Sequence, residues 1–266
     1  MTAPPCGRRP MRALNKFQKS LIDAAFADRE SWMTGGSSES KAFQEAFKNH
    51  LLDLPGPRYA NLPLSPRKAY LFTIFDGFSE IVKSLGTLED IQFYVARFPF
   101  RTDQISAERY LQFHVEAYLA EIYLLKERID KFLKLVKRQH RGDSRHAQIH
   151  QQAGALLEIS EKTLKGVVIT RHAHTHQGRF KDDGISRLGT IGLLARRMHD
   201  RKLRELFKGL YRETHLKERK RWRATISSNN VAVRRLLDVI FRNLQGLLFD
   251  RKSGQPKFPS RLAAAP

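Results

Sequence analysis

Residues 106–138 read SAERYLQFHVEAYLAEIYLLKERIDKFLKLVKR, and this stretch decides the predicted fold. Its apolar side chains recur in alternating steps of four and three residues, at Leu111, Val115, Tyr118, Ile122, Leu125, Ile129, Phe132 and Val136. Because an α-helix has 3.6 residues per turn, this spacing places all of them on one stripe. We predict a long helix over 106–138 whose stripe is buried in a helical core. The same stripe would also suit the seam of a dimer.

A second long helix follows a short interruption. Arg141-Gly142-Asp143-Ser144 is typical of a turn. Helical spacing then resumes at Ile149, Ala153, Leu156, Leu164 and Val167. The sequence therefore predicts an all-α protein, a helical bundle in which core helices of about 106–138 and 146–170 pack antiparallel, with flanking helices around them.

The flanking segments before residue 105 also show helical periodicity. We expect a helix from 12 to about 32, a flexible linker over 34–38 and a short helix, marked by Phe43, Phe47 and Leu51, that stops before Pro55. Ser65 and Pro66 are a good helix start, and Gly86 is a suitable end for that helix. Residues 88–98 fit a helix or a strand, and the helix is preferred.

Helical spacing continues after the second long helix, from Leu188 to Leu210. The polar run Ser227-Ser228-Asn229-Asn230 is expected to separate this part from a final helix that carries Val233 to Leu247. Four ranges follow as predicted domains. These are an N-terminal helix and linker (1–40), a short helical subdomain (41–104), a helical core with basic C-terminal helices (105–250) and a disordered tail (251–266).

Net charge is the unusual property of this composition. The 266 residues include 48 Lys and Arg against 27 Asp and Glu, which gives a formal charge of +21. Residues 105–266 alone hold 34 basic and 16 acidic side chains. This asymmetry favours a polyanionic partner for the C-terminal half, most often nucleic acid and less often an anionic membrane. A soluble basic surface without a dedicated ligand is the alternative.

Cysteine content and the distribution of apolar residues indicate the cellular compartment. Cys6 is the only cysteine, so an intrachain disulfide and a thiolate metal cluster are excluded and a reducing compartment fits. No signal peptide follows Met1, and no segment approaches the roughly 18 apolar residues of a membrane span. We expect a cytoplasmic protein with no membrane partner and no cofactor.

The most suggestive stretch for function is VVITRHAHTHQGR, residues 167–179. Arginine keeps its charge and can donate two hydrogen bonds to one phosphate, and histidine exchanges a proton near neutral pH. Two other interpretations stay open. His172, His174 and His176 would share one edge of a strand and could hold zinc, although on a helix only one pair would share a face. The stretch could also be a basic turn with no function.

Arg171-His172-Ala173-His174-Thr175-His176 lies at the end of the second long helix. It fits a pattern of Arg, four to six residues and His, with a polar residue directly after the Arg. It resembles the motif of the HEPN superfamily (higher eukaryotes and prokaryotes nucleotide-binding), as does the first long helix from Glu108 onwards. The resemblance covers roughly residues 105–250. It implies metal-independent cleavage of RNA by a homodimer, in a defence or toxin setting with a possible antitoxin partner. Other family members bind RNA or nucleotides without cleaving them.

The resemblance also implies residue roles. Arg171 would bind the phosphate and His176 would transfer the proton, while His172 stands where the family more often has asparagine. As a general base, His176 would withdraw the proton of a ribose 2′-hydroxyl, which then attacks the adjacent phosphate. Requiring this hydroxyl would restrict cleavage to RNA.

A basic tract over 196–223 is the second candidate feature, with 12 basic and 4 acidic side chains. We expect Leu203, Leu206 and Leu210 to form its apolar side. The charged side would then track phosphates, with Tyr211 or Trp222 stacking on bases; a solvated helix surface is the alternative. The residues predicted to contact nucleic acid are Arg179, Arg196, Arg197, Arg201, Lys202, Lys220, Arg221 and Arg223.

Two functions follow from these observations. The first is a HEPN-like, metal-independent endoribonuclease with Arg171, His172 and His176 at its catalytic site. The alternative is a non-enzymatic helical protein that binds nucleic acid or another partner through its basic C-terminal half.

Overall fold

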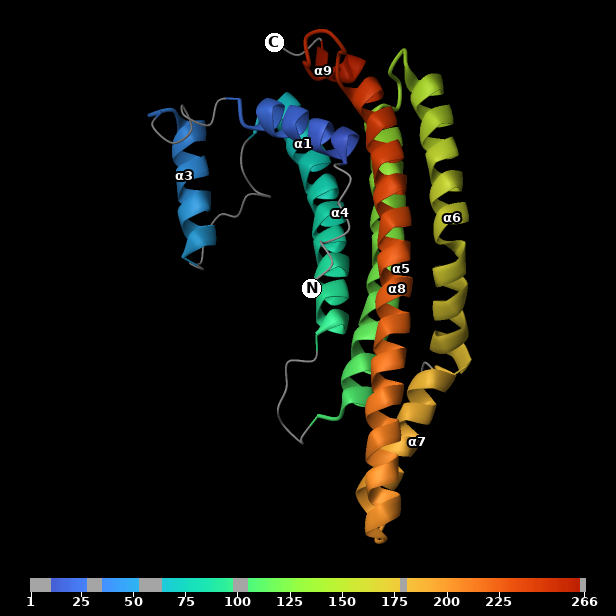
Figure 1. Cartoon of the computed structure of the whole chain (residues 1–266). Coiled ribbons are helices and arrows are strands. Elements are labelled where there is room, and N and C mark those ends of the chain that lie inside the picture. The colour runs from blue at the N-terminus through green and yellow to red at the C-terminus, as the bar shows by residue number, and fades with distance from the viewer. Residues whose placement is uncertain (1–10, 28–34, 53–63, 98–104, 178–180, 264–266) are drawn as a thin grey trace. The chain divides into compact units, whose positions relative to one another are not determined.

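The structure is a computed structural model that describes residues 11–27, 35–52, 64–97, 105–177 and 181–263, without the side chains of residues 39, 47, 50, 51 and 167–177. Over these ranges the regular structure is helical, and the only β-type pairing is one isolated antiparallel bridge between Phe249 and Pro256. The all-α prediction is confirmed (Figure 1).

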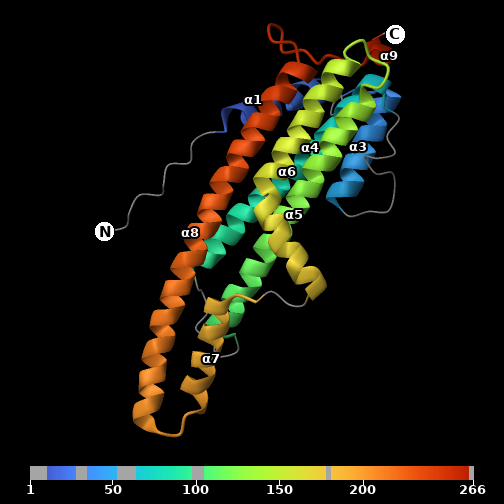
Figure 2. The same ribbon diagram turned by 90° about the vertical axis from the view of Figure 1, so that its right-hand side faces the viewer.

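The helices are α1 (Arg12–Ala25), α3 (Ser38–Leu51), α4 (Pro66–Ala96), α5 (Ala107–Gln139), α6 (His146–Gln177), α7 (Asp183–Arg197), α8 (Arg201–Leu248) and α9 (Ser260–Ala263). The two predicted long helices are α5 and α6, which run antiparallel on either side of a short turn (Figure 2). α6 continues past the predicted end at residue 170 as far as Gln177.

The apolar stripe of α5 is buried by the chain itself. Each of the stripe residues from Leu111 to Val136 is at most 2% exposed. The core interpretation is therefore correct, and the alternative of a dimer seam is wrong for this stripe.

Gly86 does not end a helix, because α4 continues to Ala96. A glycine inside a helix costs only about 1 kcal/mol relative to alanine. Leu88, Ile91 and Val95 continue the apolar face and are buried, so their burial outweighs that cost. The preference for a helix beyond residue 88 is confirmed as far as Ala96.

The polar run 227–230 lies inside α8 rather than between two helices. Asn230 is 3% exposed and fully engaged by distant residues. Its amide donates to the carbonyl oxygen of Leu88 at 3.2 Å and to Gln92 at 2.8 Å, and its oxygen accepts from the Tyr118 hydroxyl at 2.9 Å. These partners make a buried asparagine compatible with an unbroken helix.

The chain divides into two compact units, each built from several segments. Unit 1 comprises Met1–Ser79, Phe132–Leu156 and Leu237–Pro266, and unit 2 comprises Glu80–Lys131 and Leu157–Leu236. The units differ from the consecutive ranges expected from the sequence, because α4, α5, α6 and α8 each contribute residues to both.

An aromatic group forms the centre of unit 1. The rings of Phe17, Phe78 and Phe241 lie with their centroids 5.0–5.5 Å apart, and all three side chains are at most 2% exposed. Aromatic pairs at this separation add to the stabilisation that burial alone provides.

The C-terminal segment of unit 1 is held by side chains from earlier helices. Arg145 donates to the carbonyl oxygens of Lys257 at 3.3 Å and Phe258 at 3.2 Å, and Arg67 donates to that of Leu262 at 3.0 Å. The disordered tail expected for 251–266 is therefore ordered as far as Ala263.

Two glycines of α4 are expected to respond oppositely to alanine. A Cβ atom at Gly77 would lie 2.7 Å from Cδ2 of the buried Phe132 ring, whereas one at Gly86 meets no atom within 4 Å. Gly77→Ala should lower the free energy of unfolding by about 1–3 kcal/mol through overpacking. Gly86→Ala should raise it by up to about 1 kcal/mol. Urea unfolding followed by circular dichroism measures both, and equal stability of the two variants would contradict the packing described here.

Candidate nucleic-acid interface

The three residues of the predicted catalytic site lie in the last two turns of α6. The backbone is helical through Gln177, whereas the side chains of Arg171, His172 and His176, and all of Arg179, lie outside the described residues. Positions 171 and 176 are five residues apart, about 140° around a helix axis, so they fall on different faces of α6. Positions 172 and 176 share a face.

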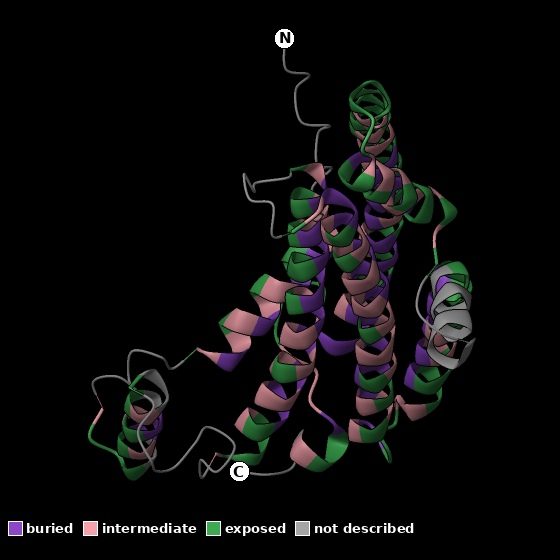
Figure 3. Cartoon of the chain, turned by 90° about the horizontal axis from the view of Figure 1, so that it is seen from below, coloured by how far each residue is buried: buried purple, intermediate pink, exposed green. Residues whose placement is uncertain are grey.

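The predicted basic tract occupies the end of α7 and the first half of α8, both in unit 2. Most of its side chains are exposed (Figure 3). Within the described part of the chain, no carboxylate lies within 4 Å of Arg197, Arg201, Lys202, Lys220 or Arg223. We call these five residues the basic face.

The four members of the basic face on α8 share one side of that helix. In helical register, Arg201, Lys202, Lys220 and Arg223 fall within about 100° of arc, and residues 201–223 span about 33 Å. Arg197 adds a further cation from the last turn of α7. On α8 these cations form two groups, Arg201 with Lys202 and Lys220 with Arg223, separated by about 27 Å along the helix axis, so they could contact phosphates at two places along one nucleic-acid strand.

Two of the predicted binding residues instead hold helices together. Arg221 donates to Asp182, the N-cap of α7, at 2.5 Å and to Glu218 at 2.7 Å. Arg196 lies 3.3 Å from Glu108 on α5. Their charges are offset by carboxylates, so the basic face omits them.

Glu108 anchors α7 and α8 to the first turn of α5. It accepts a 2.6 Å hydrogen bond from the Tyr211 hydroxyl in addition to the contact with Arg196. Burial by itself would raise the pKa of Glu108, but the hydrogen bonds to its carboxylate, the one from Tyr211 foremost, together outweigh burial and hold this pKa below the ordinary value. The carboxylate is therefore ionised at neutral pH.

The helices of this unit approach each other closely at Gly192. A Cβ atom there would lie 2.8 Å from Cε2 of Tyr211, so a side chain would push α7 away from α8. The glycine lets Tyr211 reach Glu108.

The two aromatic residues expected to stack on bases face inward. Trp222 is only 9% exposed. The hydroxyl of Tyr211 is bound to Glu108, and burial together with this hydrogen bond raises the pKa of Tyr211 to about 12. The prediction of base stacking is therefore wrong for Trp222, and Tyr211 is a structural residue.

The leucines expected on the buried side of the basic tract lie on its outside. Leu203, Leu206 and Leu210 are 45%, 56% and 39% exposed. Helix α8 turns Tyr211 and Glu218 inward instead, because the Tyr211 hydroxyl donates to Glu108 on α5 and Glu218 lies 3.7 Å from Arg187 on α7. The Trp222 side chain is buried on the same helix. The periodicity of the leucines correctly predicted a helix here, but the prediction that the leucines form its buried face was wrong.

A cluster of aromatic side chains lies at the end of α4 and the start of α5, and none of its members was among the predicted functional residues. Its members are Phe93, Tyr94, Tyr110, Phe113 and His114, and we call them the aromatic cluster. None belongs to the buried stripe of α5. The sequence contains one signal that could have indicated this cluster, namely aromatic residues at positions outside the apolar stripe of a helix.

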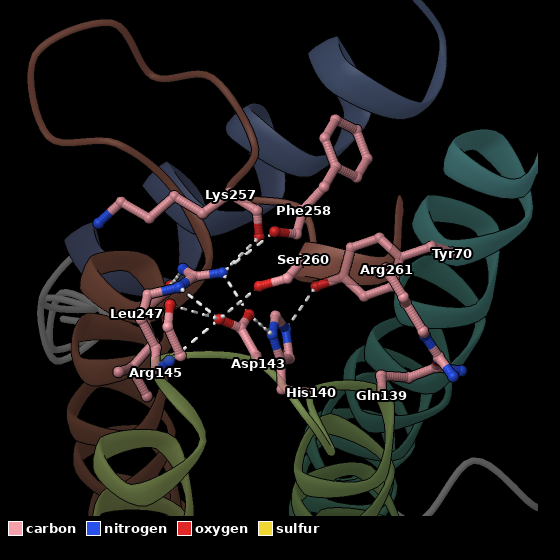
Figure 4. A network of polar contacts seen from close by, with 11 residues as sticks. Tyr70, Gln139, His140, Asp143, Arg145, Leu247, Lys257, Phe258, Ser260 and Arg261 are labelled. Atoms are coloured by element: carbon pink, nitrogen blue, oxygen red, sulfur yellow. Dashed lines mark hydrogen bonds and ion pairs between the residues drawn. The ribbon is translucent and has the colours of Figure 1, made fainter. Parts of the chain in front are cut away.

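Unit 1 contains a buried polar network at the turn between α5 and α6 (Figure 4). The Tyr70 hydroxyl lies 2.9 Å from Nε2 of His140, and Nδ1 of His140 lies 3.0 Å from Asp143. Arg145 donates to Asp143 at 2.8 Å and to the Leu247 carbonyl oxygen at 3.2 Å. His140 is 0% exposed, so substrate has no access to it and the network stabilises the turn.

The network shifts the ionisation of its members. Burial lowers the pKa of His140 and outweighs the opposing effect of Asp143. Burial alone would raise the pKa of Asp143, but hydrogen bonds from Arg145 and His140 lower it well below its ordinary value. At neutral pH the histidine is uncharged and the aspartate is ionised.

No family model matches this chain, and no curated protein or solved structure is significantly similar to it. Among the described residues, no three His, Cys, Asp or Glu side chains are grouped so that they could hold a metal ion. No helix within the described ranges has both the length and the apolar character to cross a bilayer. Over the described residues, the geometry defines a helical protein that exposes the basic face in unit 2.

Protonation of His140 should destabilise the fold. Its pKa is lower in the folded state than in the unfolded chain, so the unfolded state binds more protons as pH falls through about 6.5. His140→Gln should lower the free energy of unfolding at pH 7.5 by about 1–3 kcal/mol and flatten its decline between pH 7 and pH 5. His199→Gln, at an exposed site, is the control for urea unfolding across this range. An unchanged pH profile in His140→Gln would show that the network does not act this way.

Proposed function

We propose that this protein binds RNA in the cytoplasm and that the basic face of α7 and α8 contacts the RNA backbone. The observation that carries this proposal is the set of five exposed cations that lack a described carboxylate within 4 Å. They lie in a chain segment, residues 157–236, with 20 basic and 8 acidic side chains. Neutralising phosphates with such cations releases counterions, which supplies most of the affinity of backbone binding.

The geometry favours contacts with phosphates over contacts with bases. Lys202, Lys220 and Arg223 are long side chains on an exposed helix side. Three nearby carboxylates are already bound by arginines. Arg196 binds Glu108, and Arg221 binds both Asp182 and Glu218. Phosphate contacts position RNA without reading its sequence, so we expect weak sequence preference.

Removing charge from the basic face should weaken RNA binding and its dependence on salt. The test variant is Lys202→Gln/Lys220→Gln/Arg223→Gln. The control, Lys131→Gln/Lys134→Gln/Arg138→Gln, removes the same charge from exposed positions on α5. Fluorescence polarisation with a 20-nucleotide RNA between 50 and 200 mM KCl should show about tenfold or greater loss for the first variant. Its log–log salt slope should fall by about 0.7 for each lost phosphate contact.

The proposal fails if the unmodified protein shows no salt-sensitive RNA binding. It also fails if the control variant loses as much affinity as the test variant, because net charge rather than the basic face would then explain the binding.

A HEPN-like endoribonuclease is the second candidate, and one observation favours it. The helical backbone of α6 through Gln177 carries Arg171 and His176 at the end of a long helix that pairs with α5. Because these positions fall on different faces of α6, a phosphate would be gripped and a proton moved by residues of two copies, in the homodimer that the resemblance implies. In this function the protein would be a toxin, and an antitoxin would be its partner.

Each residue would have one role in this chemistry. His176 would take the 2′-hydroxyl proton as the ribose oxygen attacks phosphorus, and Arg171 would stabilise the charge on the phosphoryl oxygens. The other copy's His176 would give a proton to the departing 5′-oxygen, and His172 would orient the phosphate. The products are a 2′,3′-cyclic phosphate and a 5′-hydroxyl.

Substitution at either position should separate cleavage from binding. Arg171→Ala and His176→Ala should each lower RNA cleavage in chelator by at least a hundredfold and change RNA affinity less than threefold, while His174→Ala should retain activity. RNA cleavage is followed on denaturing gels. An unmodified protein that does not cleave RNA would rule out the enzyme, and activity lost to chelator would point to a metal site.

A further inference from the structure

The aromatic cluster leaves large apolar rings exposed at one place. Phe93, Tyr94 and Phe113 are 51%, 45% and 65% exposed. Burying a phenylalanine contributes roughly 1.5–3 kcal/mol, so several exposed rings side by side forgo stabilisation that an ordinary core position would give. Single exposed apolar residues need no explanation, but a contiguous group marks a binding surface.

The rings of the cluster hold one another in place. His114 is central, with its ring centroid 4.3 Å from Tyr110, 5.3 Å from Phe113 and 5.4 Å from Tyr94, the last in a stacked arrangement. The Tyr110 hydroxyl donates to the backbone carbonyl oxygen of Tyr94 at 3.2 Å, which ties α5 to α4. The surface is therefore organised before any ligand arrives, which lowers the entropy cost of binding.

Cations border the cluster. The guanidinium of Arg97 lies 4.3 Å from the centroid of the Phe93 ring, and Arg109 is exposed on α5. Burial lowers the pKa of His114, so its ring is neutral at pH 7. The surface thus joins neutral π-faces with fixed positive charge, the combination used to bind single-stranded nucleic acid.

The cluster also lies close to the helices of the basic face in unit 2. Glu108, which contacts Arg196 on α7 and Tyr211 on α8, is five residues before Phe113 on the same helix. At 1.5 Å per residue, these two positions are about 7.5 Å apart along the axis of α5. Five residues also turn about 140° around this axis, so the rings lie on a different face of α5 from Glu108, and a strand bound on α7 and α8 would pass partly around α5 to reach them.

We propose that the aromatic cluster is a stacking surface for unpaired bases of single-stranded RNA. This inference rests on the proposed RNA binding and specifies its substrate class. Bases in a duplex are stacked on each other and offer no free face, whereas unpaired bases stack on aromatic side chains. A second copy of this chain is a poorer occupant, because it would bring Arg97 and Arg109 against like charges.

Leucine substitutions in the aromatic cluster test the proposal, because leucine is apolar and of similar size but has no aromatic ring. Phe93→Leu/Phe113→Leu keeps the surface apolar and removes its two most exposed aromatic rings, Phe93→Tyr/Phe113→Tyr keeps both rings, and Leu124→Ala changes another exposed position on α5. The probes are a fluorescein-labelled 12-nucleotide oligouridine and a 12-base-pair duplex. Both carry 2′-O-methyl groups and thus lack the hydroxyl that the proposed cleavage requires. The leucine variant should bind the single strand about tenfold more weakly, as expected for one lost base stack, and the duplex within twofold of the unmodified protein. The tyrosine and Leu124→Ala variants should bind both probes within twofold.

The outcomes separate this inference from the function on which it rests. Salt-sensitive binding of both probes that is unchanged in the leucine variant would overturn the stacking surface alone. No binding by the unmodified protein would overturn RNA binding and the stacking surface together. Unchanged RNA affinity with a changed sedimentation coefficient would make the cluster a protein contact. Circular dichroism checks folding, and Phe113→Leu, at the most exposed ring, repeats the test with a single change.

Discussion

Unit 2 depends on one buried carboxylate, that of Glu108. It receives the Tyr211 hydroxyl from α8 and the Arg196 guanidinium from α7, so one side chain of α5 holds both basic helices. Two further carboxylates, Asp182 and Glu218, bind Arg221 on the same inward side. Because these three acids face inward, the exposed side of α7 and α8 keeps an uncompensated excess of cations. The contacts that stabilise the helices therefore also determine which charges remain free to bind phosphate.

The long helices could be predicted because each follows a regular apolar stripe. The steps of four and three from Leu111 to Val136 are sufficient to predict α5 and its burial. Predictions from local sequence were wrong where contacts with residues distant in the sequence determine whether a helix continues. Asn230 belongs to a polar run that reads as a helix break, yet Leu88, Gln92 and Tyr118 satisfy its amide within α8. No local pattern contains these partners.

The same dependence on distant partners applies to the basic tract. An excess of basic residues is visible in the sequence, but the pairing of Arg196 and Arg221 with carboxylates is visible only in three dimensions. Leu203 and Trp222 exchange their expected places, since α8 is oriented by its polar contacts rather than by its leucines. The aromatic cluster arises where α4 and α5 bring together Tyr94 and His114, which are separated in sequence. The side chains of the motif at 171–176 stay a prediction from resemblance.

We propose that the exposed basic side of unit 2 is the surface that contacts RNA. Photo-crosslinking of the unmodified protein to single-stranded RNA that carries 4-thiouridine, followed by mass spectrometry of the attached peptides, tests this claim most directly. We expect crosslinks concentrated in residues 197–223, with further crosslinks between Phe93 and Arg97 and between Tyr110 and His114. Crosslinks confined to unit 1, or none at 50 mM salt, would contradict the account.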